Sequence, residues 1–367
     1  MIIMGLEDEY KLALEHVRKV QWRSTHDTSK TFETNIRYLG GLLSAYDLRP
    51  DSTILNKAKE LANKVILPAY LTLNGVPSAY VNVNTGFPAV EDNIIVLAEF
   101  GSLQLELVRL SQITGDDKYA TISNKVIEKV SKVPSKYPGL YPILWNFDTF
   151  TPSIKDDYLT ISGGGDSYYE YLLKTHILMN GNETLQIDMW KTAVDSMQKY
   201  LRSETSRGMV FLAETQNSTR ILSTGELICF LPGNILLGAR YLNEPRYEDF
   251  ATELMESCYG AWTATATQLA PEAWGWVDKS QSIESFPETI QTAMATTGLI
   301  IENPGYDLRP ETAESLFYFY RLTGNSTYQD MAWNMFQAIE KYCKTPSGYT
   351  SVSNVTTFDS ERDDFQE

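Results

Sequence analysis

The sequence predicts an all-α fold in which helix pairs surround a ring, an (α/α) toroid, with short β-hairpins on one face. Three observations support it: one helix–turn–helix design recurs along the chain, the helices before and after each turn differ in polarity, and glycine-bearing, strand-like pieces follow several pairs. Buried helices alternating with half-exposed ones describe an inner ring inside an outer ring. An open superhelical solenoid is the alternative, which the all-round burial expected for the first helices disfavours.

The recurring design is an apolar helix end, a short polar turn and a second, amphipathic helix. The third and sixth copies are plainly alike, TGDDKY against TGNSTY, and each runs into a helix that ends in Ile-Glu-Lys. The six copies occupy residues 3–20, 46–65, 113–130, 179–201, 241–262 and 322–342. Six such copies predict six stacked helix pairs.

The helices before five of these turns are apolar nearly all round, whereas the helices after the turns carry one polar face. The apolar helices are expected at residues 32–46, 94–113, 165–179, 225–242 and 309–322. They form the predicted inner ring. The strand-like pieces GVPSAYVNV, GLYPILWNF, GMVFLAE and GYTSVSN are expected to form the hairpins.

The amino-acid composition limits the kinds of ligand that the chain can bind. The chain has 367 residues, is 43% hydrophobic and 21% charged, and carries a net charge of −16, which argues against binding to nucleic-acid phosphates. Its length allows two domains, but no Pro/Ser-rich linker divides it, so a single large domain built from repeats is equally consistent. Three cysteines without a CxxC pair and three scattered histidines give no zinc spacing and no histidine-based metal site.

Four Asn-X-Ser/Thr triplets point to the secretory pathway, where they would be surface glycosylation sites. They begin at Asn182, Asn217, Asn325 and Asn354. The sequence shows no signal peptide and no apolar run of about 20 residues that would span a membrane. It starts in helical pattern at MIIMGLEDEY and stops at DDFQE without a cap, which predicts a fragment of a longer protein.

The stretch YDLRPETAESLFYFYRLTG, residues 306–324, predicts a helix with a proline-led first turn. Glu311, Glu314, Ser315 and Tyr318 share one narrow polar stripe between apolar flanks. Acids in a first turn can simply complement the helix dipole. The narrowness of the stripe instead favours a mostly buried helix whose carboxylates face a cavity.

Acids recur near the starts of the other inner helices. They are Glu33, Glu99, Glu106, Asp166, Glu170 and Glu226, and Glu272 opens a further short element. Glu33 with Arg37, and Glu170 with Lys174, can be plain intrahelical ion pairs. Glu106 is different, because it shares a helix stripe with Glu99 and lies between two leucines, where a charge without a purpose is costly.

One buried glutamate is more often a satisfied structural acid than a catalyst. Acids on five inner helices of one ring are another matter, because their like charges raise some pKa values and leave others low. Such a basin suits glycoside hydrolysis, in which one carboxyl protonates the leaving oxygen and another activates water. Its oxygen ligands could also hold a hard cation such as calcium.

Several motifs, in order along nearly the whole chain, strongly resemble the class I α-1,2-mannosidases of glycoside hydrolase family 47, those of fungal type in particular. The motifs are FETNIRYLGGLLSAYDL, LAEFGSLQLELVRLSQITGD, GGGDSYYEYLLK, CFLPGN, LAPE, LRPETAESLFYFYRLTGN and PSGYTSVSNV. The resemblance implies one catalytic domain over 1–367, an (α/α)₇ barrel of which six helix pairs are visible. It also implies a calcium ion and the inverting removal of α-1,2-linked mannose from high-mannose N-glycans.

Carried over position by position, the family's general acid falls on Glu106, in LQLEL, and its general base on Glu311, in LRPE. Cleft residues that hold substrate or calcium-bound water match Arg309, Glu314 and Glu170, and further acids and bases near the cleft match Glu33, Arg37 and Glu272. These roles are what the resemblance implies.

Departures from the family pattern bear on activity. Many members have an Asp, read as a third catalytic carboxylate, where this chain has Gly225; either Glu226 substitutes from the next position or the role is absent. The family continues beyond FQE with a ring-stacking Phe, another glutamate and the Thr that directly binds calcium, and it has a helix before MIIMGL. The resemblance therefore implies a chain truncated at both ends, without its direct metal ligand.

The resemblance also implies a disulfide at Cys258, for which Cys343 is the expected partner because Cys229 lies within an inner helix. It implies a processing mannosidase of the secretory pathway, lumenal or secreted. The alternatives are a mannose-binding or glycoprotein quality-control member with little catalysis, and an unrelated α/α-toroid lyase or glycosidase, which the ordered motifs disfavour.

Overall fold

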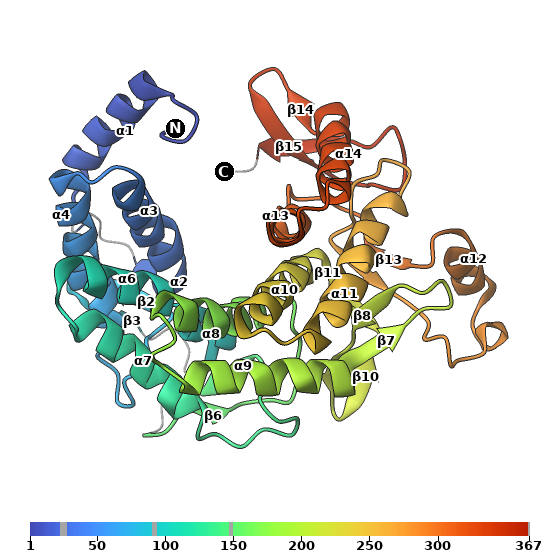
Figure 1. Cartoon of the computed structure of the whole chain (residues 1–367), viewed down its shortest axis with the longest axis horizontal. Helices are drawn as coiled ribbons and strands as arrows, with labels where there is room; N and C mark the ends of the chain where they lie inside the picture. The colour runs from blue at the N-terminus through green and yellow to red at the C-terminus, as the bar shows by residue number, and fades with distance from the viewer. Residues whose placement is uncertain (23–27, 90–93, 147–149, 366–367) are drawn as a thin grey trace. The chain divides into compact units, whose positions relative to one another are not determined.

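The computed structural model describes residues 1–22, 28–89, 94–146 and 150–365 (Figure 1). The chain divides into two compact units, the first made of Met1–Asp157 and Ser167–Lys191, the second of Tyr158–Asp166 and Thr192–Glu367. Both consist of helix pairs with small antiparallel sheets. That residues 1–367 form a single catalytic domain stays a prediction.

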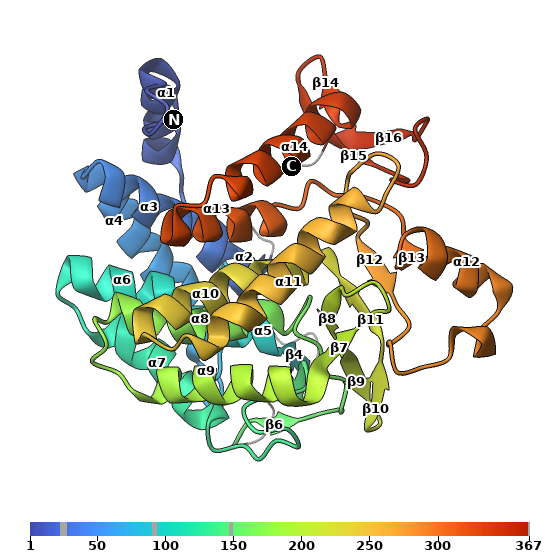
Figure 2. The same ribbon diagram turned by 45° about the vertical axis from the view of Figure 1, so that its right-hand side comes forward.

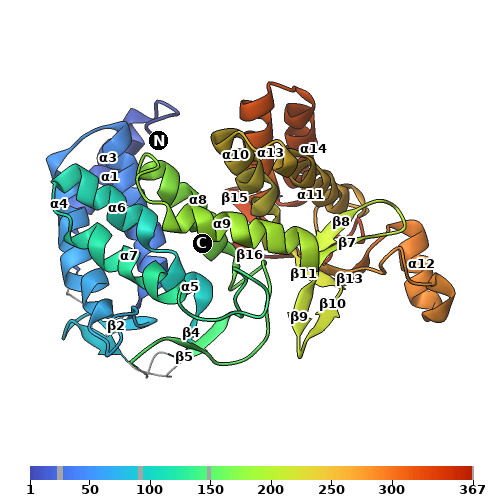
Figure 3. The ribbon, with the colours of Figure 1, turned by 60° about the horizontal axis from the view of Figure 1, so that its bottom comes forward.

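The first unit contains two of the predicted helix pairs, α3 with α4 and α6 with α7, and α1 also packs on α4. Figure 3 shows α6 and α7 side by side. Its helices are α1 (Glu7–Lys19), α2 (Thr31–Glu33), α3 (Gly40–Leu48), α4 (Ser52–Leu61), α5 (Leu97–Gly101), α6 (Gln104–Thr114), α7 (Lys118–Val130) and nearly all of α8 (Asp166–Leu178), with π-helical segments η1 (Thr34–Leu39) and η2 (Ala62–Ile66) and the 3₁₀ turn η3 (Leu67–Tyr70).

The second unit is entered through α9 (Leu185–Ser196). There α10 packs on both α11 and α13, and α13 pairs with α14 (Figure 2). The helices that follow α9 are the π-helical η4 (Met197–Leu201), the 3₁₀ turns η5 (Glu226–Phe230) and η6 (Ile283–Ser285), and α10 (Leu231–Leu242), α11 (Arg246–Thr263), α12 (Glu288–Thr296), α13 (Glu311–Thr323) and α14 (Thr327–Tyr342). Across the described parts of the chain, no helix is long and apolar enough to cross a membrane.

All strands are short and pair antiparallel, in sheets β1-β2-β3, β4-β5-β6, β7-β8, β9-β10, β11-β12-β13 and β14-β15-β16. In the first unit they are β1 (Thr28–Lys30), β2 (Tyr80–Asn82), β3 (Phe87–Ala89), β4 (Ile94–Val96), β5 (Leu144–Asn146) and β6 (Ser153–Ile154). In the second they are β7 (Arg202–Glu204), β8 (Val210–Leu212), β9 (Glu214–Gln216), β10 (Thr219–Ile221), β11 (Ser223–Gly225), β12 (Ala273–Gly275), β13 (Ile300–Asn303), β14 (Lys344–Thr345), β15 (Gly348–Val352) and β16 (Arg362–Phe365).

Each of the four predicted strand-like pieces contains a strand, namely β2, β5, β8 and β15, so that prediction is confirmed. Phe147, the last residue of the second piece, lies outside the described residues. Some pairs are hairpins, such as β14 with β15 and β2 with β3, whereas β1–β2, β4–β5 and β11–β12 join segments that are distant in the chain. These strands join the helix pairs rather than form a separate layer.

Burial follows the predicted alternation for some helices only: the outer helix α9 buries as many residues as α8 before it, and the expected inner helix α3 buries only Leu42 and Leu43. The inner helix α10 buries eight of its 12 residues, whereas the outer helix α14 buries only Met335 and Ala338 of 16. The inner helix α8 likewise buries seven of its 13 residues. Apolar residues all round a helix therefore marked burial in α8 and α10 but not in α3.

The predicted continuous helix over 94–113 is wrong. Its first residues form strand β4, which pairs with β5, and the rest is two helices, α5 and α6, broken at Ser102 and Leu103. Three β-branched residues at Ile94–Val96 suit a strand better than a helix. The break allows a close approach, since a Cβ on Gly101 would lie 2.6 Å from Tyr168. Glu99 and Glu106 therefore do not share a stripe, and Glu99 pairs with Lys30 at 2.7 Å.

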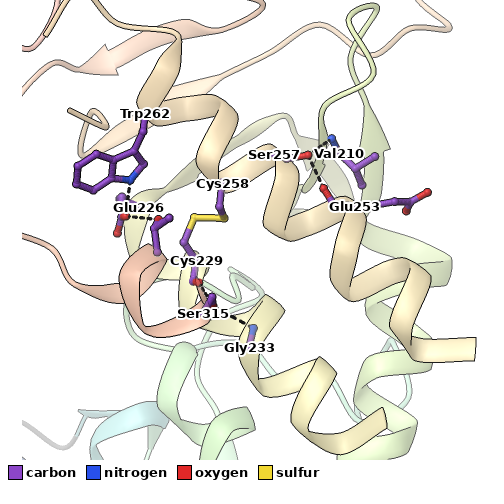
Figure 4. Close-up of a disulfide and its surroundings, with 10 residues drawn as sticks. Val210, Glu226, Cys229, Gly233, Glu253, Ser257, Cys258, Trp262 and Ser315 are labelled. Carbon is purple, nitrogen blue, oxygen red and sulfur yellow. Dashed lines mark hydrogen bonds between the residues drawn. A yellow bond between two sulfur atoms is a disulfide. The ribbon is translucent and has the colours of Figure 1, made fainter. Parts of the chain in front are cut away.

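The predicted Cys258–Cys343 disulfide is also wrong. Cys229 and Cys258 form the bond, with their Cα atoms 5.8 Å apart, and Cys343 is a buried free thiol. Cys229 lies in the 3₁₀ turn η5, just before α10, and α10 packs along α11, which carries Cys258. A position in an inner helix thus brings Cys229 to its partner instead of excluding it (Figure 4).

Candidate active site

Glu106 lies in the first turn of α6, and neutral donors surround its carboxyl group. Asn35 donates from Nδ2 to Oε2 at 2.8 Å, and the Tyr171 hydroxyl donates to Oε1 at 2.9 Å. Burial raises the pKa of Glu106 to about 7, against those two hydrogen bonds, and the charge of Glu170 also raises it. A carboxyl with such a pKa can hold a proton near neutrality and give it up.

Asn35 and Tyr171 were not predicted from the sequence. Asn35 is fully buried in the π-helical segment η1, and its Oδ1 has no hydrogen-bond partner among the described residues. If the Asn35 amide turned over, Oδ1 could accept the proton of a neutral Glu106. In the sequence, these two residues are marked only by their place on expected inner helices near candidate acids. A π-helical turn, which is frequent at functional sites, cannot be predicted from the sequence.

The remaining candidates of the first unit form the ordinary pairs that their spacing allowed. Glu33 and Arg37 make an intrahelical ion pair at 2.7 Å, with the Arg37 side chain 69% exposed. Glu170 pairs with Lys174 one turn along α8. Of these residues, Glu170 is near enough to affect the pKa of Glu106, whereas Glu33 and Arg37 contact each other.

Glu311 begins α13 in the second unit, where a cation stands beside it. Burial raises its pKa, against its own backbone hydrogen bond and the charge of Arg309, while Glu314 raises it slightly further. Arg309 is held by Glu272, to which its Nε and a terminal nitrogen both donate at 2.8 Å, and Glu272 also accepts from the backbone N–H of Asp307 at 2.9 Å. Arg309, Glu311, Glu314 and Glu272 are thus brought together.

Backbone strain precedes this helix. Leu308, immediately before Arg309, has φ of +56°, in the left-handed region that an L side chain with a branched body rarely adopts. Such residues persist where the surrounding structure holds them, and they concentrate at functional sites. Here the turn aims Arg309 at Glu272.

Glu226 is 1% exposed at the start of η5. Its Oε1 accepts from the Thr312 hydroxyl at 2.6 Å and from Trp262 Nε1 at 3.3 Å, the latter drawn in Figure 4. Burial, and then the neighbouring Glu311 carboxylate, raise the pKa of Glu226 well above its ordinary value. Thr312 and Trp262 were not predicted, and nothing local in the sequence marks them.

The expectation that α13 is mostly buried is wrong on one side. Thr312, Ser315, Leu316 and Phe319 are buried, but Phe317 is 57% exposed. A hollow of about 760 Å³ runs along this side and is lined by residues of α13 and α14. The two sides of α13 therefore differ in burial. Ser315 is buried against α10, where the Gly233 N–H donates to its hydroxyl at 2.9 Å, whereas Phe317 is exposed on the other side.

Gly225 lies in strand β11, where a side chain would meet its neighbours. A Cβ there would be 3.0 Å from the Glu272 carbonyl oxygen and 3.2 Å from Ser162 Oγ. The same carbonyl accepts from the Glu226 N–H at 3.0 Å. The space that an aspartate would need is thus taken by the backbone that carries Glu272.

A metal site is not apparent in the described ranges, where no group of three or more His, Cys, Asp or Glu side chains is arranged to hold an ion.

Comparison with known proteins identifies the family of the chain. The family model "Glycosyl hydrolase family 47" matches residues 1–367. A mannosyl-oligosaccharide alpha-1,2-mannosidase of Coccidioides posadasii is 36% identical, over 98% of this chain and 71% of its own length. A mannosyl-oligosaccharide 1,2-alpha-mannosidase of Arabidopsis thaliana is 37% identical, over 97% of this chain and 62% of its own length.

The solved structure of an alpha-1,2-mannosidase from Trichoderma reesei superposes with a TM-score of 0.91 at 35% identity, covering 97% of this chain and 77% of that one. This likeness confirms the predicted fold class, an α/α-barrel type of architecture. The chain spans from three-fifths to three-quarters of the length of these relatives. A family model over its whole length, and relatives at this identity, establish that the chain belongs to glycosyl hydrolase family 47, a family of glycoside hydrolases.

Proposed function

We propose that the chain hydrolyses terminal α-1,2-linked mannose from high-mannose N-glycans with inversion at the anomeric carbon, with Glu106 as general acid and Glu311 as general base. The names of the relatives support the substrate class. The residue roles rest on the resemblance and on the surroundings of the two carboxyl groups.

In this mechanism, Glu106 gives its proton to the glycosidic oxygen as the bond from that oxygen to the anomeric carbon breaks. Glu311 takes a proton from a water molecule whose oxygen attacks the same carbon from the opposite face. The product is β-mannose, and Glu106 ends ionised while Glu311 ends protonated. Solvent exchange restores both.

The observation that carries the proposal is the contrast between the two carboxyl groups. Glu106 has only neutral donors and a pKa of about 7, so it is suited to hold a proton. Glu311 has the charge of Arg309 beside it, which favours its ionised form. Burial raises the pKa of both groups, but at Glu311 a neighbouring cation opposes that rise, and such a difference suits an acid–base pair.

The other candidates are proposed to bind sugar hydroxyls or ordered water. Arg309 and Glu272, joined as an ion pair, can offer donors and acceptors to one sugar ring. Glu314 and Glu170 each lie near a proposed catalytic carboxyl, as their effects on its pKa indicate. Glu33 and Arg37 are kept as more distant contributors, since they pair with each other.

Calcium dependence is proposed from the resemblance alone. In the described ranges no three His, Cys, Asp or Glu side chains are grouped so that they could hold such an ion.

The proposed setting is the secretory pathway, with the chain lumenal or secreted. Three of the four glycosylation triplets have exposed asparagines, Asn182, Asn217 and Asn325, and Asn354 is half-buried. Asn217 sits in the tight turn between β9 and β10, with φ of +50°. Exposed turns are where a glycan can be attached without disturbing the fold.

A second candidate is a mannose-binding member with little catalysis, which Gly225 favours because it removes an aspartate that many relatives have. Substitution Glu106→Gln separates the two. For a catalyst, we expect mannose release from a high-mannose N-glycan to fall about 10² to 10⁴-fold, the usual worth of a general acid, with glycan binding retained.

The matched control is Glu99→Gln, which changes a carboxylate of the same unit that pairs with Lys30 instead. Release should be followed by the anomer first formed, with calcium and with a chelator. Glycan binding without any release in the parent chain would favour the binding protein, and α-mannose as first product would contradict inversion.

A further inference from the structure

Glu226 is the most enclosed acid near the proposed base, and its position is fixed from two directions. The Cys229–Cys258 disulfide ties η5, which begins with Glu226, to α11, which carries Trp262 (Figure 4). On the other side, the Ser315 hydroxyl of α13 donates to the Cys229 carbonyl and accepts from the Gly233 N–H. These contacts hold η5, which begins with Glu226, next to α13, which begins with Glu311.

Only one of the two oxygens of Glu226 is satisfied by its surroundings. Oε1 accepts from Thr312 and Trp262. Oε2 is buried, and no N–H or O–H donor among the described residues reaches it. Glu311 shows the same pattern, with a buried Oε2 that has no donor in the described part of the chain.

The two carboxyl groups lie close enough for a hydrogen bond between their side chains. Two ionised carboxylates cannot form one, because both would be acceptors only. Two buried acceptor oxygens without donors would also cost several kcal/mol by leaving charges unsatisfied. One proton between the two groups removes both difficulties, as in other paired carboxyls.

The surroundings decide which group carries the proton. Glu311 has the Arg309 cation and the N-terminus of α13, both of which favour its charge. Glu226 is almost wholly enclosed, and the described side chains that contact its carboxyl group are Thr312, Trp262 and Glu311, none of them a cation. The charge therefore belongs on Glu311 and the proton on Glu226.

We infer that Glu226 is a positioning residue: a neutral carboxylic acid whose O–H donates to the Glu311 carboxylate, orienting it toward water and keeping it ionised. This rests on the proposed role of Glu311 as base. Glu226 is not expected to touch substrate, since it is 1% exposed. It would hold Glu311 from the chain position next to Gly225, where a Cβ would lie 3.0 Å from the Glu272 carbonyl oxygen.

Infrared spectroscopy on chain carrying carboxyl-labelled glutamate tests the proton directly. At pH 8 we expect a protonated-carboxyl band that Glu226→Gln removes. Glu106→Gln should leave it, because Glu106, with a pKa of about 7, is mostly ionised at that pH. Absence of such a band in the parent chain, or its survival in Glu226→Gln, would overturn the inference.

A second variant covers the case in which Glu226→Gln does not fold. In Glu311→Gln the neighbouring charge is lost, and that charge raises the pKa of Glu226. The band should therefore titrate away at a lower pH than in the parent chain. An unchanged titration would contradict the pairing.

Mannose release then tests positioning. The amide introduced by Glu226→Gln has an N–H that can still donate to Glu311. This variant should therefore retain a larger share of kcat/KM than Glu226→Leu. The leucine variant should lose about 100-fold in kcat/KM, as for a displaced reacting group. Glu253→Gln, on α11 and paired with Arg202, is the control. If Glu226 acts as a charged carboxylate, the Gln and Leu variants should be equally inactive. If the parent chain shows the protonated-carboxyl band but releases no mannose, the proposed function is wrong, whereas the sharing of a proton between Glu226 and Glu311 is still supported.

Discussion

Glu106 and Glu311 are both glutamates whose carboxyl groups are largely buried, but the groups that surround them differ. Glu106 is held by an amide and a phenol and keeps a high pKa. Glu311 stands beside an arginine, at a helix N-terminus, with a second carboxyl behind it. The comparison teaches that burial raises the pKa of both groups, and that a neighbouring cation opposes this rise at Glu311 whereas neutral donors surround Glu106.

The two regions also differ in how they are braced. The Glu226–Glu311 region contains the disulfide, whereas the carboxyl group of Glu106 is held by hydrogen bonds from Asn35 and Tyr171. Replacing both Cys229 and Cys258 by serine should lower the free energy of unfolding by about 3 kcal/mol, from the loss of a cross-link 29 residues apart. Chemical denaturation measures this.

The control for that double substitution is Cys343→Ala, which alters a buried thiol that forms no disulfide. It should cost clearly less. The Glu106 pKa should be the same in both variants, because its partners lie on other elements. Equal losses from the two variants would mean that the disulfide does not brace this region as argued.

Glu106 should also make stability depend on pH. Its pKa is raised from 4.5 to about 7, so between these values the folded chain binds more protons than the unfolded one. Stability is therefore lost as pH rises through this window. Glu106→Gln removes that dependence and should be the more stable form at pH 8, by on the order of 1 to 3 kcal/mol, with little advantage at pH 4.5.

The measurement is denaturant unfolding of both forms across the window. The unpaired Asn35 Oδ1 should help the amide of Glu106→Gln fit, because a turned Asn35 side chain can accept its N–H. A parent chain whose stability is flat from pH 4.5 to 8 relative to Glu106→Gln would show that Glu106 is not perturbed.

Arg309 tests the other half of the comparison. Its charge lowers the pKa of Glu311, so Arg309→Ala should raise that pKa. The acid limb of kcat/KM should move to higher pH by about one unit, the low end for loss of an adjacent opposite charge. Glu272→Gln is the control, since it removes the partner of Arg309 but not the charge, and should not move the limb upward. If the acid limb of kcat/KM stays at the same pH in Arg309→Ala, Arg309 does not lower the pKa of Glu311.

Local pattern predicted a good part of this molecule. The first turn of α13 begins where Pro310 and Glu311 indicated, and the likeness of TGDDKY to TGNSTY does mark the starts of two outer helices, α7 and α14. Glu106 and Glu311 were singled out because each stands among apolar residues on an expected inner helix, and their catalytic roles stay predictions. Helix period, turn residues and burial are local properties, so sequence carries them.

What sequence missed depends on approaches between distant segments. The helix over 94–113 is broken because β4 pairs with β5 and Tyr168 packs on Gly101. The disulfide was misassigned because the approach of η5 to α11 is tertiary. Asn35, Tyr171, Thr312 and Trp262 matter only through the carboxyl groups they reach, and those lie far along the chain or on another element.

Two glycines give the smallest and most direct comparison between the regions. Gly41, in α3 of the first unit, would place a Cβ with nothing within 4 Å, so Gly41→Ala should stabilise its helix by about 0.5 to 1 kcal/mol. Gly225→Ala should instead cost about 1 kcal/mol, because its Cβ meets the Glu272 carbonyl at 3.0 Å in a paired strand. Thermal unfolding of the two variants gives the opposite signs directly. Gly225→Asp should then be worse than alanine and should not raise mannose release, since it pushes on the segment that presents Glu272 and Glu226. If it folds as well as the parent and releases mannose faster, the site had room for the family's aspartate, and Glu226 is not its replacement.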